Sequence, residues 1–170
     1  MKINKNMNKL LLLCCFLLSA GVFAQSETEL PDVNLKTLEG ETVNFADYAD
    51  NGKITVFSFW ATWCIPCKEE LNNINEYYAD WQEDYDMELV AVSIDDQRST
   101  GRVQTYVNGT GWEYTVLLDV NEDLKRALNF QTVPFTMVVD AKGNVVFQHT
   151  GYVEGDEYEL EDLLSKLSEE

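Results

Sequence analysis

The sequence predicts an α/β fold in which helices flank a central mixed β-sheet. Two nearly continuous apolar runs, 53–60 and 89–94, have the composition of strands that are buried on both faces. Between them, Leu71, Ile74 and Tyr78 recur at spacings of three and four residues, which is the period of a helix packed on a core. The order strand, helix, strand indicates a parallel β-α-β crossover.

Two pairs of segments add antiparallel strands to this sheet. Strands at 135–139 and 145–149 flank a short turn and predict a hairpin. Strands at 33–36 and 42–45 flank Gly40 and predict an N-terminal β-hairpin extension at the edge of the domain. The other expected elements are a helix at 66–82, a helix from a cap at Ser99 or Thr100 to Gly109, a strand at 115–118, a brief helix capped by Asn121, and an amphipathic helix with Leu160, Leu163, Leu164 and Leu167 on one face.

Residues 1–24 have the composition of a secretory signal peptide. Lysines precede an apolar run that starts at Leu10 and ends in a small-residue cleavage pattern at Ala24. The run of about 14 residues is shorter than the roughly 20 that span a bilayer as a helix, so cleavage is favoured over permanent anchoring. We therefore expect 25–32 to be a linker and 33–170 to be a single domain, in the periplasm or another extracytoplasmic compartment.

The charge balance is strongly acidic. The chain has 12 basic and 30 acidic residues and a formal net charge of −18. Because the signal segment contains lysines and no acidic residue, the mature chain is more acidic still. This charge argues against nucleic acid as a partner and is typical of a solvated, soluble surface.

Only Cys64 and Cys67 remain once the signal segment is removed, since Cys14 and Cys15 lie inside it. A four-ligand zinc site is excluded because only His149 could join the pair. The WCIPC motif follows the first buried strand and opens the next helix, where unpaired N–H groups and the helix dipole favour a thiolate. The thiolate is the attacking species in disulfide exchange. We therefore predict that Cys64 is the nucleophile and that Cys67, on the same helical face, is the resolving thiol.

Five segments of the chain form a recognisable pattern. They are VFSFWATWCIPCKEEL, SIDD, TVPFT, VVDAKGNVV and HTGY. This pattern resembles the exported thioredoxin-like family that includes TlpA and ResA, over roughly residues 33–167. FWATWC with a later Val-Pro-Phe-Thr is highly specific, whereas CxxC alone would be far weaker. The resemblance implies a thioredoxin-like fold and a thiol:disulfide oxidoreductase that needs no bound cofactor or metal.

The resemblance also implies residues that bind substrate. The bond between Val133 and Pro134 would be the family's cis peptide bond beside the cysteines, and it would leave the backbone of Val133 free to pair with an extended substrate. Trp63 would form part of the substrate-facing rim, next to the spacer residues Ile65 and Pro66. Pro66 suits the first turn of a helix, where its missing N–H removes no hydrogen bond.

Glu70 is a further expectation from the resemblance, because ResA-type members have a glutamate three residues after the second cysteine. One helical turn past Cys67, it could accept or relay the proton of the resolving thiol, and burial would raise its pKa toward that task. Ser58 stands where thioredoxins themselves have a buried aspartate, which makes Glu70 the better candidate for this relay. Asn72 stands where many relatives have a helix-kinking proline, so a straighter helix is expected.

Three conspicuous residues are expected to be structural. Trp60 ends the first buried strand and belongs to the core by its pattern. Lys68 is expected on the exposed helix surface, although a lysine there could also favour a thiolate. His149, the only histidine, is expected on the solvent side of its strand rather than as a ligand or base.

The leading functional interpretation is an exported enzyme that reduces disulfides of extracytoplasmic proteins, including apocytochrome c. By resemblance, its electrons would come from a membrane thiol transporter of the DsbD or CcdA kind. A disulfide-introducing oxidase remains open because the exchange is reversible, and a copper-binding metallochaperone remains open because thiolates suit Cu(I). A peroxidase is weaker, since its Pro-x-x-x-Thr-x-x-Cys arrangement is absent. A binding module stapled by the cysteine pair is the last alternative.

Overall fold

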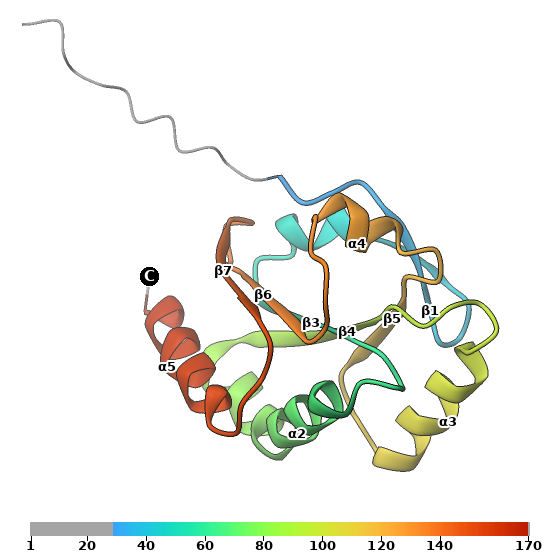
Figure 1. Ribbon diagram of the computed structural model, residues 1–170. Coiled ribbons are helices and arrows are strands. Elements are labelled where there is room, and N and C mark those ends of the chain that lie inside the picture. The colour runs from blue at the N-terminus through green and yellow to red at the C-terminus, as the bar shows by residue number, and fades with distance from the viewer. Residues whose placement is uncertain (1–28, 170) are drawn as a thin grey trace, which may run out of the picture.

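Seven strands form one mixed sheet in residues 29–169, the part of the chain that the computed structural model describes (Figure 1). The predicted signal peptide at 1–24 lies outside the described residues. The elements are β1 Asn34–Thr37, β2 Thr42–Asn44, the 3-10 helix η1 Phe45–Asp50, β3 Ile54–Trp60, α2 Ile65–Tyr85, β4 Met87–Ser93, α3 Thr100–Thr110, β5 Thr115–Leu118, α4 Asp123–Ala127, β6 Phe135–Val139, β7 Val145–Thr150 and α5 Asp156–Ser168. Within this range, no helix has the length and apolar character that crossing a membrane requires.

The strand order is β2-β1-β5-β4-β3-β6-β7. The central strands β3, β4 and β5 run parallel, whereas β6 and β7 are antiparallel to their neighbours. The hairpin of β1 and β2 extends the other edge through antiparallel pairing with β5. The predicted mixed sheet and the N-terminal hairpin are therefore confirmed. The carboxyl ends of β3 and β4 and the start of β6 meet at one edge of the sheet.

Helices cover both faces of the sheet. Figure 1 shows α2, α3 and α5 on one face and η1 and α4 on the other. The side chains of β3 alternate between these layers: Phe57 and Phe59 pack on rings from η1 and from the segment after α4. Ser58 and Trp60 instead contact residues of α2 and α3. Burial on both faces explains why β3 is apolar almost throughout.

The two predicted helix caps have different outcomes. Ser99 occupies the N-cap position of α3, as predicted, but its side chain makes no capping hydrogen bond. The predicted cap at Asn121 is wrong, because Glu122 occupies the N-cap position of α4. The buried carboxylate of Asp119 accepts the N–H groups of two residues in the first turn of α4, and Asp96 accepts the N–H of Ser99 before α3. An acceptor several residues upstream replaces a local cap when the chain folds back on itself, which residue spacing alone does not reveal.

Candidate active site

The junction between β3 and α2 carries the cysteine pair. The strand ends at Trp60, a short turn follows, and α2 begins at Ile65 with Cys64 at its N-cap position. The N–H of Cys67 donates to Sγ of Cys64 over 3.3 Å. This sulfur therefore satisfies one of the N–H groups that the first turn of a helix leaves unpaired. The predicted succession of strand, CxxC turn and helix is confirmed.

Cys64 and Cys67 are joined by a disulfide, and their Cα atoms lie 5.4 Å apart. The two residues differ in exposure, because 5% of the surface of Cys64 is exposed and 0% of that of Cys67. An external disulfide can therefore reach Cys64 first, whereas Cys67 can react only with a group already held at Cys64. The helix N-terminus favours a thiolate at the accessible position.

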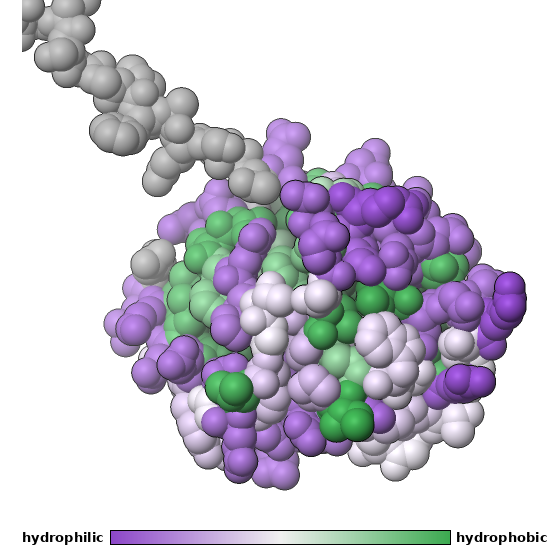
Figure 2. Space-filling model, in the orientation of Figure 1, coloured by the Kyte–Doolittle hydropathy of each residue, from purple (hydrophilic) through white to green (hydrophobic). Residues whose placement is uncertain are grey.

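Exposed apolar side chains flank the pair. Trp63 is 67% exposed and Ile65 is 64% exposed, which is unusual for large hydrophobic residues. Pro66 is exposed in the first turn of α2. Figure 2 shows hydrophobic surface near the start of α2 among neutral and hydrophilic regions. Such a patch beside a reactive sulfur is suited to contact with another polypeptide.

Glu70 is buried one helical turn after Cys67. Its carboxylate accepts hydrogen bonds from Oγ of Ser58 at 3.0 Å and from Oγ1 of Thr136 at 2.6 Å. Burial raises the pKa of Glu70 to about 7; the two hydrogen bonds oppose this rise, and the charge of Asp156 adds to it. A carboxyl group with this pKa can take up or release a proton near neutrality.

The peptide bond between Val133 and Pro134 is cis, as expected. The register pairs Phe59 of β3 with Phe135 of β6, so Pro134 lies beside the end of β3 that leads to the cysteine pair. The carbonyl of Pro134 accepts a hydrogen bond from the N–H of Gly151 at 2.8 Å. The CxxC turn, the proline and the segment after β7 are thereby gathered at one edge of the sheet.

Comparison with known proteins agrees with this geometry. Residues 27–148 match the AhpC/TSA family. The chain belongs to that family. A relative called thiol-disulfide oxidoreductase ResA, from Bacillus thuringiensis (strain Al Hakam), is 30% identical over 158 residues, which cover 90% of this chain and 87% of the relative. The family member described here is accordingly a thiol:disulfide oxidoreductase.

Solved structures confirm the thioredoxin-like fold of this oxidoreductase. An uncharacterized thioredoxin-like protein from Porphyromonas gingivalis is 45% identical with a TM-score of 0.74, and the match covers 83% of this chain and 92% of that one. A putative thiol:disulfide interchange protein DsbE from Chlorobium tepidum is 26% identical with a TM-score of 0.73, covering 82% and 95% respectively. The predicted resemblance to the TlpA and ResA type is therefore confirmed.

Asp95 supports the active-site turn and was not singled out from the sequence. It is buried shortly after β4, and its carboxylate accepts the N–H of Thr62 at 2.8 Å, the hydroxyl of Thr62 at 2.7 Å and the hydroxyl of Ser93 at 2.9 Å. These bonds fasten the turn that carries Trp63 to the end of β4. The SIDD motif was the available signal, but the sequence does not indicate what its acids contact.

Replacing Asp95 with alanine should lower the free energy of unfolding by about 2 kcal/mol, because a backbone N–H and two hydroxyls lose a shared acceptor. Reduction of a peptide disulfide should also slow, because the turn before Cys64 loses its anchor. Denaturant unfolding and a peptide reduction assay measure the two effects. Asp84→Ala, which removes an exposed carboxylate of α2, is the control. Equal behaviour of the two variants would contradict the anchoring role.

The three residues expected to be structural have different outcomes. Trp60 is fully buried, which confirms its place in the core. Lys68 is half-buried with its ammonium over an aromatic ring of α3, so it is less exposed than expected. His149 is exposed as expected, yet its Nε2 also lies 3.6 Å from Oδ2 of Asp156. Asn72 lies within α2, which is continuous from Ile65 to Tyr85, and its side-chain oxygen accepts a hydrogen bond from the indole N–H of Trp112.

Proposed function

We propose that this oxidoreductase is exported and reduces disulfides of extracytoplasmic proteins, including apocytochrome c during cytochrome c maturation. The observation that carries the proposal is the unequal exposure of Cys64 and Cys67 at the start of α2, next to a buried carboxyl group. The signal-like composition of 1–24 supports export. The name of the ResA relative supports chemistry on disulfides.

Two exchange steps would transfer two electrons to the substrate. The thiolate of Cys64 attacks a substrate disulfide, forms a mixed disulfide and releases the first substrate sulfur as a thiolate. Glu70 takes the proton of the Cys67 thiol, and the new thiolate attacks Sγ of Cys64. The second substrate sulfur leaves, and the disulfide between Cys64 and Cys67 forms. A membrane thiol transporter of the DsbD or CcdA kind would then return two electrons by the same exchange in reverse.

The substrate would bind as an extended segment across the end of the sheet where the CxxC turn, Pro134 and the segment after β7 meet. Pro134 has no N–H, so it leaves the neighbouring backbone of Val133 available for pairing with a passing strand. Trp63, Ile65 and Pro66 would contact its side chains, which is supported by the exposure of all three. Recognition through backbone and apolar contact suits an enzyme that accepts more than one protein disulfide.

Replacing Cys67 with alanine in the full chain tests the proposal, because Cys64 could then capture a substrate but not release it. We expect mixed disulfides to accumulate in the exported fraction and to dissociate on addition of dithiothreitol, with the captured proteins identified by mass spectrometry. A variant that also carries Cys64→Ala should capture none. An exported fraction without captured proteins, or a strongly oxidising reduction potential of the parent couple, would contradict the reductase assignment.

A further inference from the structure

A row of polar side chains crosses the sheet from Glu70 to the edge strand. Ser58 of β3 pairs in register with Thr136 of β6, and Thr136 pairs with His149 of β7. Directly paired residues project to the same face of a sheet, here the face beneath α2 and α5. The two hydroxyls hold the Glu70 carboxylate, and β7 is the last strand of the sheet, so the row ends at solvent.

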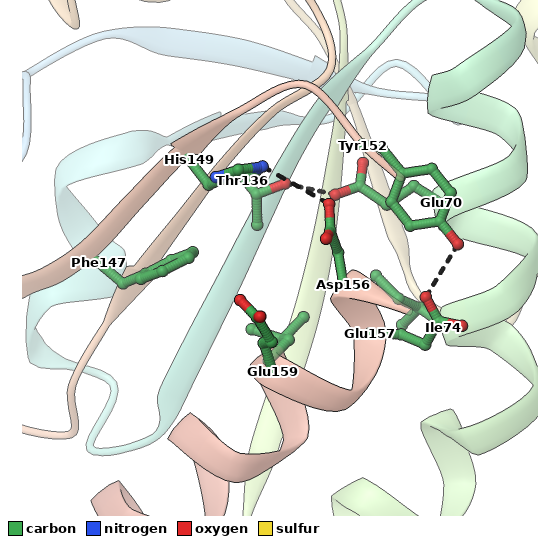
Figure 3. Close-up of a pocket in the computed structure, with 10 residues that line it drawn as sticks. Glu70, Ile74, Thr136, Phe147, His149, Tyr152, Asp156, Glu157 and Glu159 are labelled. Carbon is green, nitrogen blue, oxygen red and sulfur yellow. Dashed lines mark hydrogen bonds and ion pairs between the residues drawn. The ribbon is translucent and has the colours of Figure 1, made fainter. Parts of the chain in front are cut away.

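The outer end of the row is a contact between His149 and Asp156. Nε2 of His149 lies 3.6 Å from Oδ2 of Asp156, the first residue of α5. The side chain of His149 is 46% exposed and that of Asp156 is 26% exposed, so both reach water. Figure 3 shows this pair and the bond between Thr136 and Glu70 around the same cavity. A surface base therefore lies close to the buried acid.

The cavity between them has a volume of about 30 Å³ and is lined by Glu70, Thr136, His149 and Asp156 among others. A water molecule needs roughly 10–15 Å³ of such space and two to four polar partners. The cavity has this space, and Glu70, Thr136, His149 and Asp156 are among the polar side chains of its lining. Tyr152 also lines it, but its hydroxyl is already engaged by Glu157 and by an asparagine of α2. The open route for a proton thus runs from Glu70 toward His149.

We propose that His149, positioned by Asp156, is the solvent end of a proton path through which protonated Glu70 loses its proton during catalysis. The proposal rests on the proposed function, in which Glu70 takes the proton of Cys67. Protonated Glu70 gives its proton to cavity water, this water gives a proton to Nε2 of neutral His149, and the imidazolium releases it to bulk solvent. No electron moves, and the carboxylate is restored for the next turnover.

The charged surroundings suit this path. The titratable groups that face Glu70 or His149 are Asp156, Glu157 and Glu159 of α5, Tyr152 before that helix, and Tyr114 before β5. Burial raises the pKa of both tyrosines, so they remain neutral near pH 7. Of the described residues that line the cavity, none is a lysine or arginine. Acidic side chains therefore dominate, and Asp156 can hold the imidazolium until its proton leaves.

His149→Ala tests the path at an exposed position of the edge strand. At neutral pH, we expect multiple-turnover reduction of a peptide disulfide to slow by about tenfold, less than the loss of at least ~10²-fold that is typical when the group that takes the proton directly is removed. Imidazole in the buffer should restore the rate, because it can occupy the space of the missing ring. Gln148→Ala, which alters the neighbouring exposed residue on the other face of β7, should match the parent with and without imidazole.

Glu70→Gln separates the two possible failures. Rescue of His149→Ala by imidazole, together with a slow Glu70→Gln that imidazole leaves slow, supports the path. A His149→Ala rate equal to the parent rate, with Glu70→Gln slow, overturns the path and leaves the proposed function intact. A slow His149→Ala that imidazole does not restore also overturns the path, since His149 is then structural. A Glu70→Gln rate equal to the parent rate overturns both the relay at Glu70 and the path.

Discussion

The Cys64→Ser variant should lose its disulfide reductase activity, by at least about 10³-fold and down to the background rate. Serine has the same shape as cysteine, but its hydroxyl does not ionise near neutral pH, so no thiolate is available to attack a disulfide. Cys67 cannot replace it, because Cys67 has no exposed surface. Reduction of a fluorescent peptide disulfide measures the loss, and mass spectrometry should detect no mixed disulfide.

Cys67→Ser is the matched control for this variant. It also removes the disulfide between Cys64 and Cys67, so any loss of stability is shared by the two proteins. Cys67→Ser should still form a mixed disulfide with one equivalent of peptide, because its accessible sulfur remains. If Cys64→Ser forms the mixed disulfide and Cys67→Ser does not, the roles of the two cysteines are reversed.

The strands were predictable because their signals are local. The predicted strands at 115–118 and 135–139 coincide with β5 and β6, since each is a short apolar run bounded by turn residues. The first helix was predicted at 66–82 and extends over Ile65–Tyr85, because polar helix ends carry no apolar period. The 3-10 helix η1 was not predicted, since a single short turn has almost no periodic signal.

The active site was predictable only where its chemistry lies in one motif. Cys64 and Cys67 share a helical turn, so residue spacing alone brings them together. The bond between Glu70 and Thr136 depends on how β6 pairs with β3, and that register is set by the whole sheet. The contact between His149 and its partner on α5 likewise depends on how that helix packs. Tertiary packing therefore supplies the surroundings of the buried acid.

Those surroundings predict an effect of Glu70 on stability that depends on pH. Its pKa rises from 4.5 to about 7 in the folded protein, mainly through burial. The folded state therefore binds a proton more tightly than the unfolded state does. The stability that this proton contributes is fully present below pH 4.5 and is lost as the pH rises through about 7. Above that pH, the folded protein must hold a buried charge.

Glu70→Gln should remove this penalty and raise the free energy of unfolding at pH 8 by about 3 kcal/mol, with little change near pH 4.5. The amide fits because its oxygen can accept from one hydroxyl, Ser58 or Thr136, while its nitrogen donates to the other. Urea unfolding of the oxidised protein at both pH values measures the difference. Glu69→Gln, at the exposed neighbouring position, should change stability by less than about 0.5 kcal/mol at either pH.

Parallel pH profiles for the parent and Glu70→Gln would show that the folded protein does not raise the pKa of this carboxyl group. The expected result is a variant that gains stability while it loses the rate of disulfide reduction. Such a trade-off is the behaviour of a buried group that is kept for catalysis at a cost in folding free energy. If the only role of Glu70 were to support the helix, its replacement would lower the free energy of unfolding. The sign of the change at pH 8 therefore distinguishes the two roles.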